Sequence, residues 1–271
     1  MLPEQTLGES VLKLKAIRQE KIWGWEDWLL STHPNGLQQE LFDFCGGEHP
    51  LLVKVIQANE VLSVQVHPDD EQAARFGLPH GKSECWYVLQ ANEGAQLVCS
   101  LNRVCTKEQI KTAVESETLP QLLSWQHVRS GDFVYIPAGT VHAIGGGMRL
   151  LEVQQSSDVT LRLYDWGRGR ECDVERATEC IKQDETIRVV PFTGKFACEY
   201  FSLEEIRVRG GQCLSLKASS PHPALVFVIQ AKEGSFVGGE AAGAEDAFAF
   251  AAGETIELAG EIRAMLIEAR L

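Results

Sequence analysis

The chain of 271 residues is long enough for one large domain or two modest ones, and its 44% hydrophobic and 23% charged residues exclude disorder as the default. Its 25 Lys and Arg residues against 38 Asp and Glu residues give a formal charge of -13, which opposes non-specific binding to nucleic acid or to an anionic membrane. An anionic substrate would therefore need a local basic patch.

Residues 1–25 carry charges within every apolar run, so we expect neither a signal peptide nor a membrane-spanning helix there, and we expect a cytoplasmic protein. The eight cysteines are scattered and include no C-x-x-C pair. We expect most of them to be buried small hydrophobes in a reducing compartment.

The stretch VLSVQVHPDD, residues 61–70, predicts a strand that is interrupted by a glutamine and a histidine. Successive strand residues point to opposite faces, so Gln65 and His67 share one face while Val64 and Val66 share the other. An antiparallel strand with a solvated face would also explain this pattern. The alternative is that two potential metal ligands lie side by side.

Short apolar or alternating runs separated by Gly and Pro recur from residue 51 to residue 264, which predicts a mainly β fold of jelly-roll barrels or sandwiches. Residues 106–128 differ: Thr106 is a plausible helix N-cap, and we expect a helical insertion near 106–125 that stops near Pro120 and resumes in QLLSW. A second helix is expected in residues 174–186. We place a domain boundary near residue 185, which divides the chain into 1–185 and 186–271.

Two later segments supply further candidate ligands. Glu84 enters the β-prone run GKSECWYVL, and the segment GDFVYIPAGTVHAI has the spacing G-x5-P-x-G-x2-H that ends at His142. With Gln65 and His67 they form an O, N, O, N set, which suits a borderline divalent ion such as zinc and leaves room for a water or a substrate oxygen.

This G-x5-P-x-G-x2-H spacing resembles the second conserved motif of the cupin superfamily. The first cupin motif departs from the usual pattern, because Gln65 stands where a histidine is usual and Glu84 lies 17 residues after His67. Together, SVQVHPDD, GKSECWYVL, YIPAGTVHAI and LLEVQQSSDVTLRLYDWGR resemble the type I mannose-6-phosphate isomerases in their short bacterial form. The matched motifs span roughly residues 12–175, although Leu29 stands where the family usually has an acid.

The resemblance implies a metal centre and a set of catalytic residues. It implies one zinc ion per chain, held by Gln65, His67, Glu84 and His142. It also implies that Arg162 is the active-site arginine with Asp158 near it, and that Lys82 is the family's lysine two residues before the ligand glutamate.

The family reaction interconverts mannose 6-phosphate and fructose 6-phosphate through an enediol. Arg162 and Lys82 would meet anionic oxygens. Asp158, at an even spacing from Arg162 in an expected strand, would either orient Arg162 or act as the base. Lys82 as a solvated side chain, or Arg162 and Asp158 as a surface ion pair, are the structural alternatives.

Residues 186–271 resemble the metal-free C-terminal cupin-like domain of the family, with packing against the first domain as their expected role. We expect a sugar phosphate as the partner, no nucleic acid or membrane, and a monomer or homodimer. Two other functions remain open: a metal cupin of another type, such as an iron dioxygenase, which Gln65 disfavours because those sites are rich in imidazole, and a sugar-phosphate sensor without turnover.

Overall fold

The structure is a computed structural model that describes residues 10–183 and 187–270. It is mainly β, with antiparallel strands and a few short helices, as the sequence predicts. Two compact units can be distinguished. Unit 2 comprises residues 18–28 and 52–192, and unit 1 comprises 1–17, 29–51 and 193–271.

Unit 2 contains most of a seven-stranded sheet whose interior face carries buried polar residues. In spatial order this sheet consists of β13 (Val190–Pro191), β9 (Asp132–Ile136), β6 (Glu84–Ala91), β11 (Met148–Gln155), β4 (Leu51–Ala58), β3 (Gly24–Leu30) and β2 (Ile17–Lys21).

A five-stranded sheet lies in the same unit, and its order is β12 (Leu161–Tyr164), β5 (Val64–Val66), β10 (His142–Ile144), β7 (Gln96–Leu101) and β8 (Leu123–His127). Leu97 and Cys99 of this sheet share an apolar cluster with Trp86 and Leu150 of the larger one. Both sheets are open among the described residues, so the expected jelly roll is a sandwich rather than a closed barrel.

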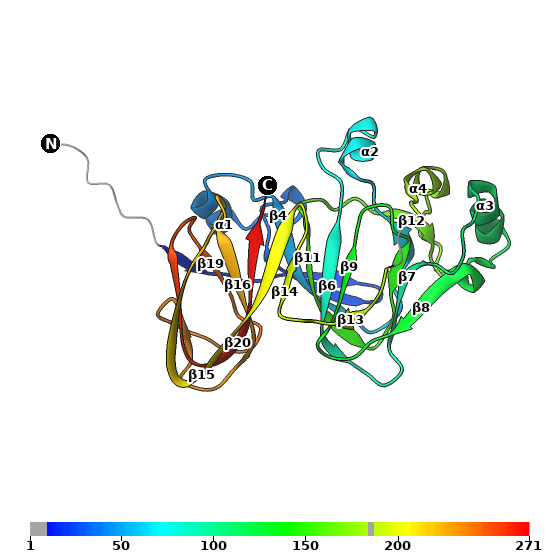
Figure 1. The fold of residues 1–271 in the computed structure, drawn as a ribbon. Coiled ribbons are helices and arrows are strands. Elements are labelled where there is room, and N and C mark those ends of the chain that lie inside the picture. Colours follow the sequence, from blue (N-terminus) through cyan, green and yellow to red (C-terminus); the bar gives the residue numbers. More distant parts are fainter. Residues whose placement is uncertain (1–9, 184–186, 271) are drawn as a thin grey trace. The chain divides into compact units, whose positions relative to one another are not determined.

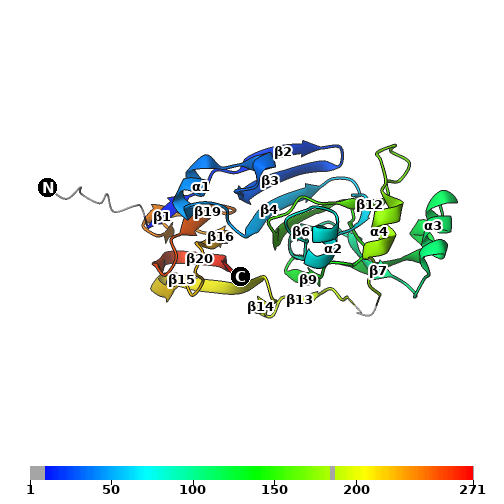
Figure 2. The same cartoon turned by 90° about the horizontal axis from the view of Figure 1, so that it is seen from above.

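The helix α3 (Lys107–Glu115), the 3-10 turn η2 (Leu119–Leu122) and the helix α4 (Val174–Cys180) cover the other face of the five-stranded sheet. The short helix α2 (Asp70–Arg75) lies in the connection between β5 and β6. Figures 1 and 2 show α3 and α4 side by side, and Lys111 of α3 pairs with Glu175 of α4 at 2.5 Å. Ile110, Ala177 and Val98 belong to the apolar cluster beneath these helices.

The expected insertion is found as α3, which begins after a capping box formed by Thr106 and Gln109. The expectation that a helix resumes in QLLSW is wrong. Leu123–His127 forms β8 instead, because Trp125 pairs with Val98 on β7 and packs on the same apolar cluster. The second expected helix is α4, and its last three predicted residues, 184–186, lie outside the described residues.

Unit 1 contains an eight-stranded sheet built mainly from the C-terminal part of the chain. Its path is β1 (Val11–Lys13), β19 (Ala247–Phe250), β16 (Ala224–Ala231), β20 (Thr255–Ala269), β15 (Phe201–Lys217) and β14 (Lys195–Ala197). Off this path, β17 (Phe236–Val237) pairs with β20, and β18 (Glu240–Ala241) pairs with β17. The unit also holds the 3-10 turn η1 (Pro34–Gly36) and the helix α1 (Gln39–Cys45).

The N-terminal strand belongs to unit 1, because Val11 pairs with Phe250 and Lys13 with Phe248. Near the predicted boundary, unit 2 ends at residue 192 and unit 1 resumes at residue 193. The predicted boundary between 185 and 186 lies outside the described residues and stays a prediction. No helix of the described residues is long and apolar enough to cross a membrane.

His49 is a buried histidine that connects two segments of unit 1. Its Nδ1 accepts a hydrogen bond from the Leu51 N–H at 3.1 Å, and its Nε2 lies 3.0 Å from the Pro223 carbonyl oxygen. Nε2–H is therefore the donor of a neutral ring. Burial lowers the pKa of His49 to about 4, and the ring of His222 lies 5.9 Å away.

We expect this histidine to make unit 1 less stable in acid. Between its unfolded pKa of about 6.5 and its folded pKa of about 4, only the unfolded chain takes up the proton, so its contribution to the free energy of unfolding falls by up to about 3 kcal/mol as the pH falls. In urea unfolding, the stability difference between wild type and His49→Gln should therefore shrink from pH 7 to pH 4.5. A difference that stays constant with pH would contradict this.

Candidate metal centre

The segments that carry the predicted ligands meet at neighbouring strand ends of unit 2. Gln65 is the central residue of β5, His67 follows that strand, Glu84 begins β6, and His142 begins β10. Gln65 pairs with His142 on one side and with Arg162 of β12 on the other. Directly paired strand residues share a face, so these three side chains form a row across the five-stranded sheet.

A proline and glycine turn places His142 in this row. Pro137 to Gly139 separates β9 from β10, and Gly139 has φ +95°, a conformation that favours glycine. The Gly139 N–H donates to the His67 carbonyl oxygen at 2.8 Å, which joins the turn directly to the segment of the other histidine.

His67, Glu84 and His142 form a compact, fully buried cluster. Their potential ligand atoms all lie within 4.8 Å of one another. His67 Nε2 is 3.5 Å from Glu84 Oε2, and His142 Nε2 is 3.4 Å from Glu84 Oε1. Ligands that bind zinc tetrahedrally at about 2.1 Å are roughly 3.4 Å apart, so these two separations match the edges of such a site.

The protonation states also fit a divalent ion. The His142 Nδ1–H donates to the Thr140 carbonyl oxygen at 2.9 Å, which leaves the Nε2 lone pair directed at the cluster. Burial lowers the pKa of His142, and burial together with the Lys82 ammonium lowers the pKa of His67 to about 3. Both rings are therefore neutral at pH 7, which is the form that binds metals.

Glu84 supplies the negative charge of the cluster. Burial alone would raise its pKa, but Lys82 and then His67 hold the pKa of Glu84 well below its usual range. Lys82 Nζ lies 2.9 Å from Glu84 Oε2, although neither carboxylate oxygen receives a well-aligned hydrogen bond from a described residue. A fully buried carboxylate with unused lone pairs fits a cation.

Gln65 and Lys82 complete the surroundings of this cluster. Gln65 Nε2 is 3.2 Å from His142 Nε2, so turning the amide over would present its oxygen to the same cluster. Lys82 Nζ is 3.1 Å from His67 Nε2. Lys82 is 5% exposed, which rejects the solvated-lysine alternative.

Arg162 and Asp158 occupy different environments. Arg162 is partly buried and donates from Nη1 to the Glu171 carbonyl oxygen at 2.7 Å, while its buried Nε has no partner among the described residues. Burial, followed by the nearby Arg170, lowers its pKa. Asp158 lies in an exposed loop before β12, so the expectation that it shares a strand face with Arg162 is wrong.

The two aspartates after Pro68 organise the loop beside the cluster. Asp69 caps α2 in a capping box with Gln72. Asp70 Oδ1 accepts hydrogen bonds from the Gly81 N–H at 2.7 Å and from Gln155 Nε2 at 3.0 Å. These bonds tie the segment after His67 to the segment that leads into Glu84.

Gly81 allows that close approach. A Cβ atom at this position would lie 2.5 Å from the Asp69 carbonyl carbon and 2.7 Å from the Pro68 carbonyl oxygen, which is closer than real Cβ contacts. The Lys82 N–H donates to the same Pro68 oxygen at 3.0 Å. Any side chain at position 81 must therefore push the two segments apart.

We expect Gly81→Ala to lower the free energy of unfolding by about 1–3 kcal/mol and to weaken metal binding by about 10-fold or more. Thermal unfolding and competition with a chelator measure the two effects. Gly243→Ala is the matched control, because its nearest non-neighbouring atom would be 3.7 Å away and its backbone is not in the positive-φ region. Equal behaviour of the two variants would contradict the close-approach argument.

Sequence reasoning missed a buried ion-pair network next to the cluster. Lys54 Nζ lies 2.8 Å from Glu152 Oε1 and 3.9 Å from Glu26 Oε2, and Trp86 Nε1 donates to Glu152 Oε2 at 2.7 Å. Burial would lower the pKa of Lys54, but Glu152 and Glu26 raise it. The Trp86 ring lies edge-on to His142 with centroids 5.5 Å apart, so the network supports a proposed ligand. In the sequence, the network could have been recognised from two charged residues inside apolar runs, Lys54 in LLVKVI and Glu152 in RLLEV.

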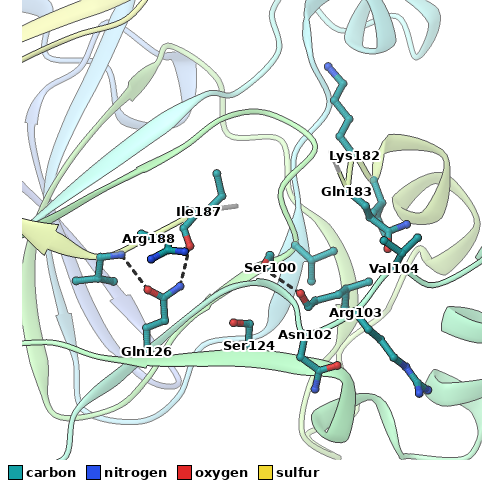
Figure 3. Close-up of a pocket in the computed structure, with 14 residues that line it drawn as sticks. Ser100, Asn102, Arg103, Val104, Ser124, Gln126, Lys182, Gln183, Ile187 and Arg188 are labelled. Atoms are coloured by element: carbon teal, nitrogen blue, oxygen red, sulfur yellow. Dashed lines mark hydrogen bonds between the residues drawn. The ribbon is translucent and has the colours of Figure 1, made fainter. Parts of the chain in front are cut away.

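A separate pocket of about 570 Å³ lies in unit 2, but no residue of the cluster lines it. Figure 3 shows that its three cationic side chains, Arg103, Lys182 and Arg188, extend in different directions. Lys182 is paired with Asp69 at 2.7 Å. The pocket therefore offers no single cationic site, and we assign it no ligand.

Comparisons with known proteins identify relatives of the chain. Residues 13–107 match the family model described as phosphomannose isomerase type I, catalytic domain. The chain is 33% identical over 282 residues to the mannose-6-phosphate isomerase ManA of Bacillus subtilis, in a match that covers 84% of this chain and 88% of that protein.

Two solved structures share the fold. The mannose 6-phosphate isomerase from Bacillus subtilis superposes with a TM-score of 0.78 at 24% identity, covering 96% of this chain and 100% of that one. A mannose 6-phosphate isomerase bound with zinc and yttrium superposes with a TM-score of 0.68 at 16% identity, covering 97% of this chain and 100% of that one. Both likenesses support the cupin-type sandwich described above.

Proposed function

The chain belongs to the type I mannose-6-phosphate isomerase family, and from this premise we propose that it interconverts mannose 6-phosphate and fructose 6-phosphate at a zinc site through an enediol. The observation that carries the proposal is the buried cluster of His67, Glu84 and His142. Support for zinc comes from the neutral imidazoles, the ionised carboxylate and the ligand separations. A fold relative binds zinc.

We assign four residues to the metal and three to the reaction. In the proposal His67, Glu84 and His142 hold one zinc ion per chain, with the Gln65 amide oxygen as the fourth protein ligand. In the proposal Arg162, Lys82 and Asp158 are the reacting groups.

The reaction moves a proton between C1 and C2 of the open-chain sugar. The base takes the C2 proton of the aldose, the resulting enediol is reprotonated at C1, and the hydroxyl proton passes from O2 to O1. The negative charge that develops on these oxygens is the costly feature. A bound zinc ion would supply positive charge to them as a Lewis acid.

The chain's own residues supply the rest. Arg162 lies in the same row as Gln65 and His142, so its guanidinium can donate charge-assisted hydrogen bonds to an anionic oxygen. Lys82 holds Glu84 ionised and adds a second positive charge beside the cluster. Asp158 stays the proposed base or orienting group for Arg162, acting from its loop rather than from a strand.

We also propose a cytoplasmic location, because the eight cysteines are thiols and a reducing compartment keeps thiols reduced. A monomer or homodimer remains the expected oligomeric state.

The function is tested by NMR with mannose 6-phosphate in deuterated water. The proposal predicts fructose 6-phosphate and deuterium incorporation at C1 or C2, without oxygen consumption. Oxygen-dependent turnover would favour a dioxygenase. Tight binding of mannose 6-phosphate without product or exchange would favour the sensor.

A further inference from the structure

Gln154 is a fully buried residue of β11 that the proposed mechanism does not use. It pairs directly with Glu84 of β6, so the two side chains lie on the same face of the seven-stranded sheet. Neighbouring β-carbons of such pairs are about 5 Å apart. Gln154 therefore stands beside the carboxylate of the proposed zinc site.

The orientation of its amide is set by two carbonyl groups. Gln154 Nε2 donates to the Gln155 carbonyl oxygen at 2.9 Å and to the Ser157 carbonyl oxygen at 2.5 Å. Turning the amide over would place its oxygen against these two carbonyl oxygens, which is repulsive. Both amide hydrogens are thus used, and Oε1 is the atom that faces away from this turn.

Oε1 itself is buried, and no described residue donates a hydrogen bond to it. Leaving a buried carbonyl unpaired is costly, so such an atom in a native structure calls for a partner from outside the chain. The partner must be a hydrogen-bond donor or a cation, because a carbonyl oxygen offers only lone pairs. The proposed zinc ion already has four protein ligands, which leaves a donor as the partner.

We propose that Gln154 Oε1 accepts a hydrogen bond from a hydroxyl group of the bound sugar phosphate. This inference rests on the proposed function, which supplies a polyhydroxylated substrate next to Glu84. Gln154 is then a specificity residue. Its Nε2 holds the turn at Ser157, immediately before Asp158, and its Oε1 reads one hydroxyl of the sugar.

The test is a double cycle, in which the affinity is measured for every combination of protein variant and ligand. Isothermal titration measures fructose 6-phosphate and a series of deoxyhexose 6-phosphates, each of which lacks one hydroxyl, against zinc-loaded wild type and Gln154→Met. We expect Gln154→Met to raise the Kd of the complete sugar phosphate by about 3- to 10-fold. That loss should vanish for the one analogue that lacks the recognised hydroxyl.

Gln154→Glu separates the two roles of the amide and also serves if Gln154→Met fails to fold. It keeps an acceptor at this position but loses both donors to the turn. The proposal predicts that the hydroxyl-dependent part of the affinity persists in Gln154→Glu and is absent in Gln154→Met. Equal losses in both variants for every analogue, or no change in either, would overturn it.

The wild-type titration separates a failure of the Gln154 proposal from a failure of the proposed function. If wild type turns over mannose 6-phosphate but the cycle shows no hydroxyl-specific coupling, only the role of Gln154 fails. If wild type neither binds nor converts any hexose 6-phosphate, the proposed function fails first.

Discussion

Glu84→Gln is expected to lower turnover of mannose 6-phosphate by about 10³-fold or more and to strip the protein of its metal. The amide keeps the shape of the carboxylate but removes the negative charge that faces His67, His142 and Lys82. It also leaves the buried Lys82 ammonium without its counter-ion, which we expect to cost about 3 kcal/mol of stability.

The measurements for this variant are steady-state kinetics, metal content by mass spectrometry and thermal unfolding. Glu93→Gln is the matched control, because Glu93 is an exposed carboxylate in the turn between β6 and β7. Glu84→Gln that kept its zinc and more than a tenth of its activity would show that the buried carboxylate does not hold the metal.

Arg162→Ala has the second largest expected effect, a fall in kcat/KM of about 10²- to 10³-fold with the zinc content unchanged. Arg162 shares the row of Gln65 and His142 but is not a ligand, so its loss should affect the substrate and not the metal. Arg162→Lys should recover little of the activity, since an ammonium cannot reproduce the planar fork of a guanidinium.

Arg75→Ala controls for the loss of a positive charge in this acidic protein, because Arg75 is exposed on α2 and pairs with Glu71 of the same helix. Joint loss of zinc and activity in Arg162→Ala would instead make this arginine a structural support of the centre.

The local sequence was sufficient for the predictions that depend on a single strand or turn. The shared face of Gln65 and His67 follows from the two-residue period of a strand. The placement of His142 follows from a turn that needs Pro137 and Gly139 at fixed positions. The helix α3 was predictable because its capping box, Thr106 and Gln109, is local.

The parts that failed depend on pairing between strands. Asp158 was assigned to a strand by even spacing, but the chain forms a turn held by Gln154 and Ser157 and enters β12 only at Leu161. Trp125 was assigned to a helix, but the pairing of β8 with β7 decides its conformation. Local propensity cannot foresee a partner strand.

The buried polar residues around the centre were missed for the same reason. Lys54 and Glu152 lie in different strands, nearly a hundred positions apart, and only the sheet order brings their charges together. Gln154 becomes informative only once its register with Glu84 and its unpaired oxygen are known.

Zinc dependence of the isomerase is tested by a zinc titration of chelator-treated wild type, with the isomerisation of mannose 6-phosphate as the readout. We predict that activity disappears with the metal and returns in full at one zinc ion per chain. Full activity in the folded, metal-free protein, or a zinc-loaded protein without turnover, would contradict it.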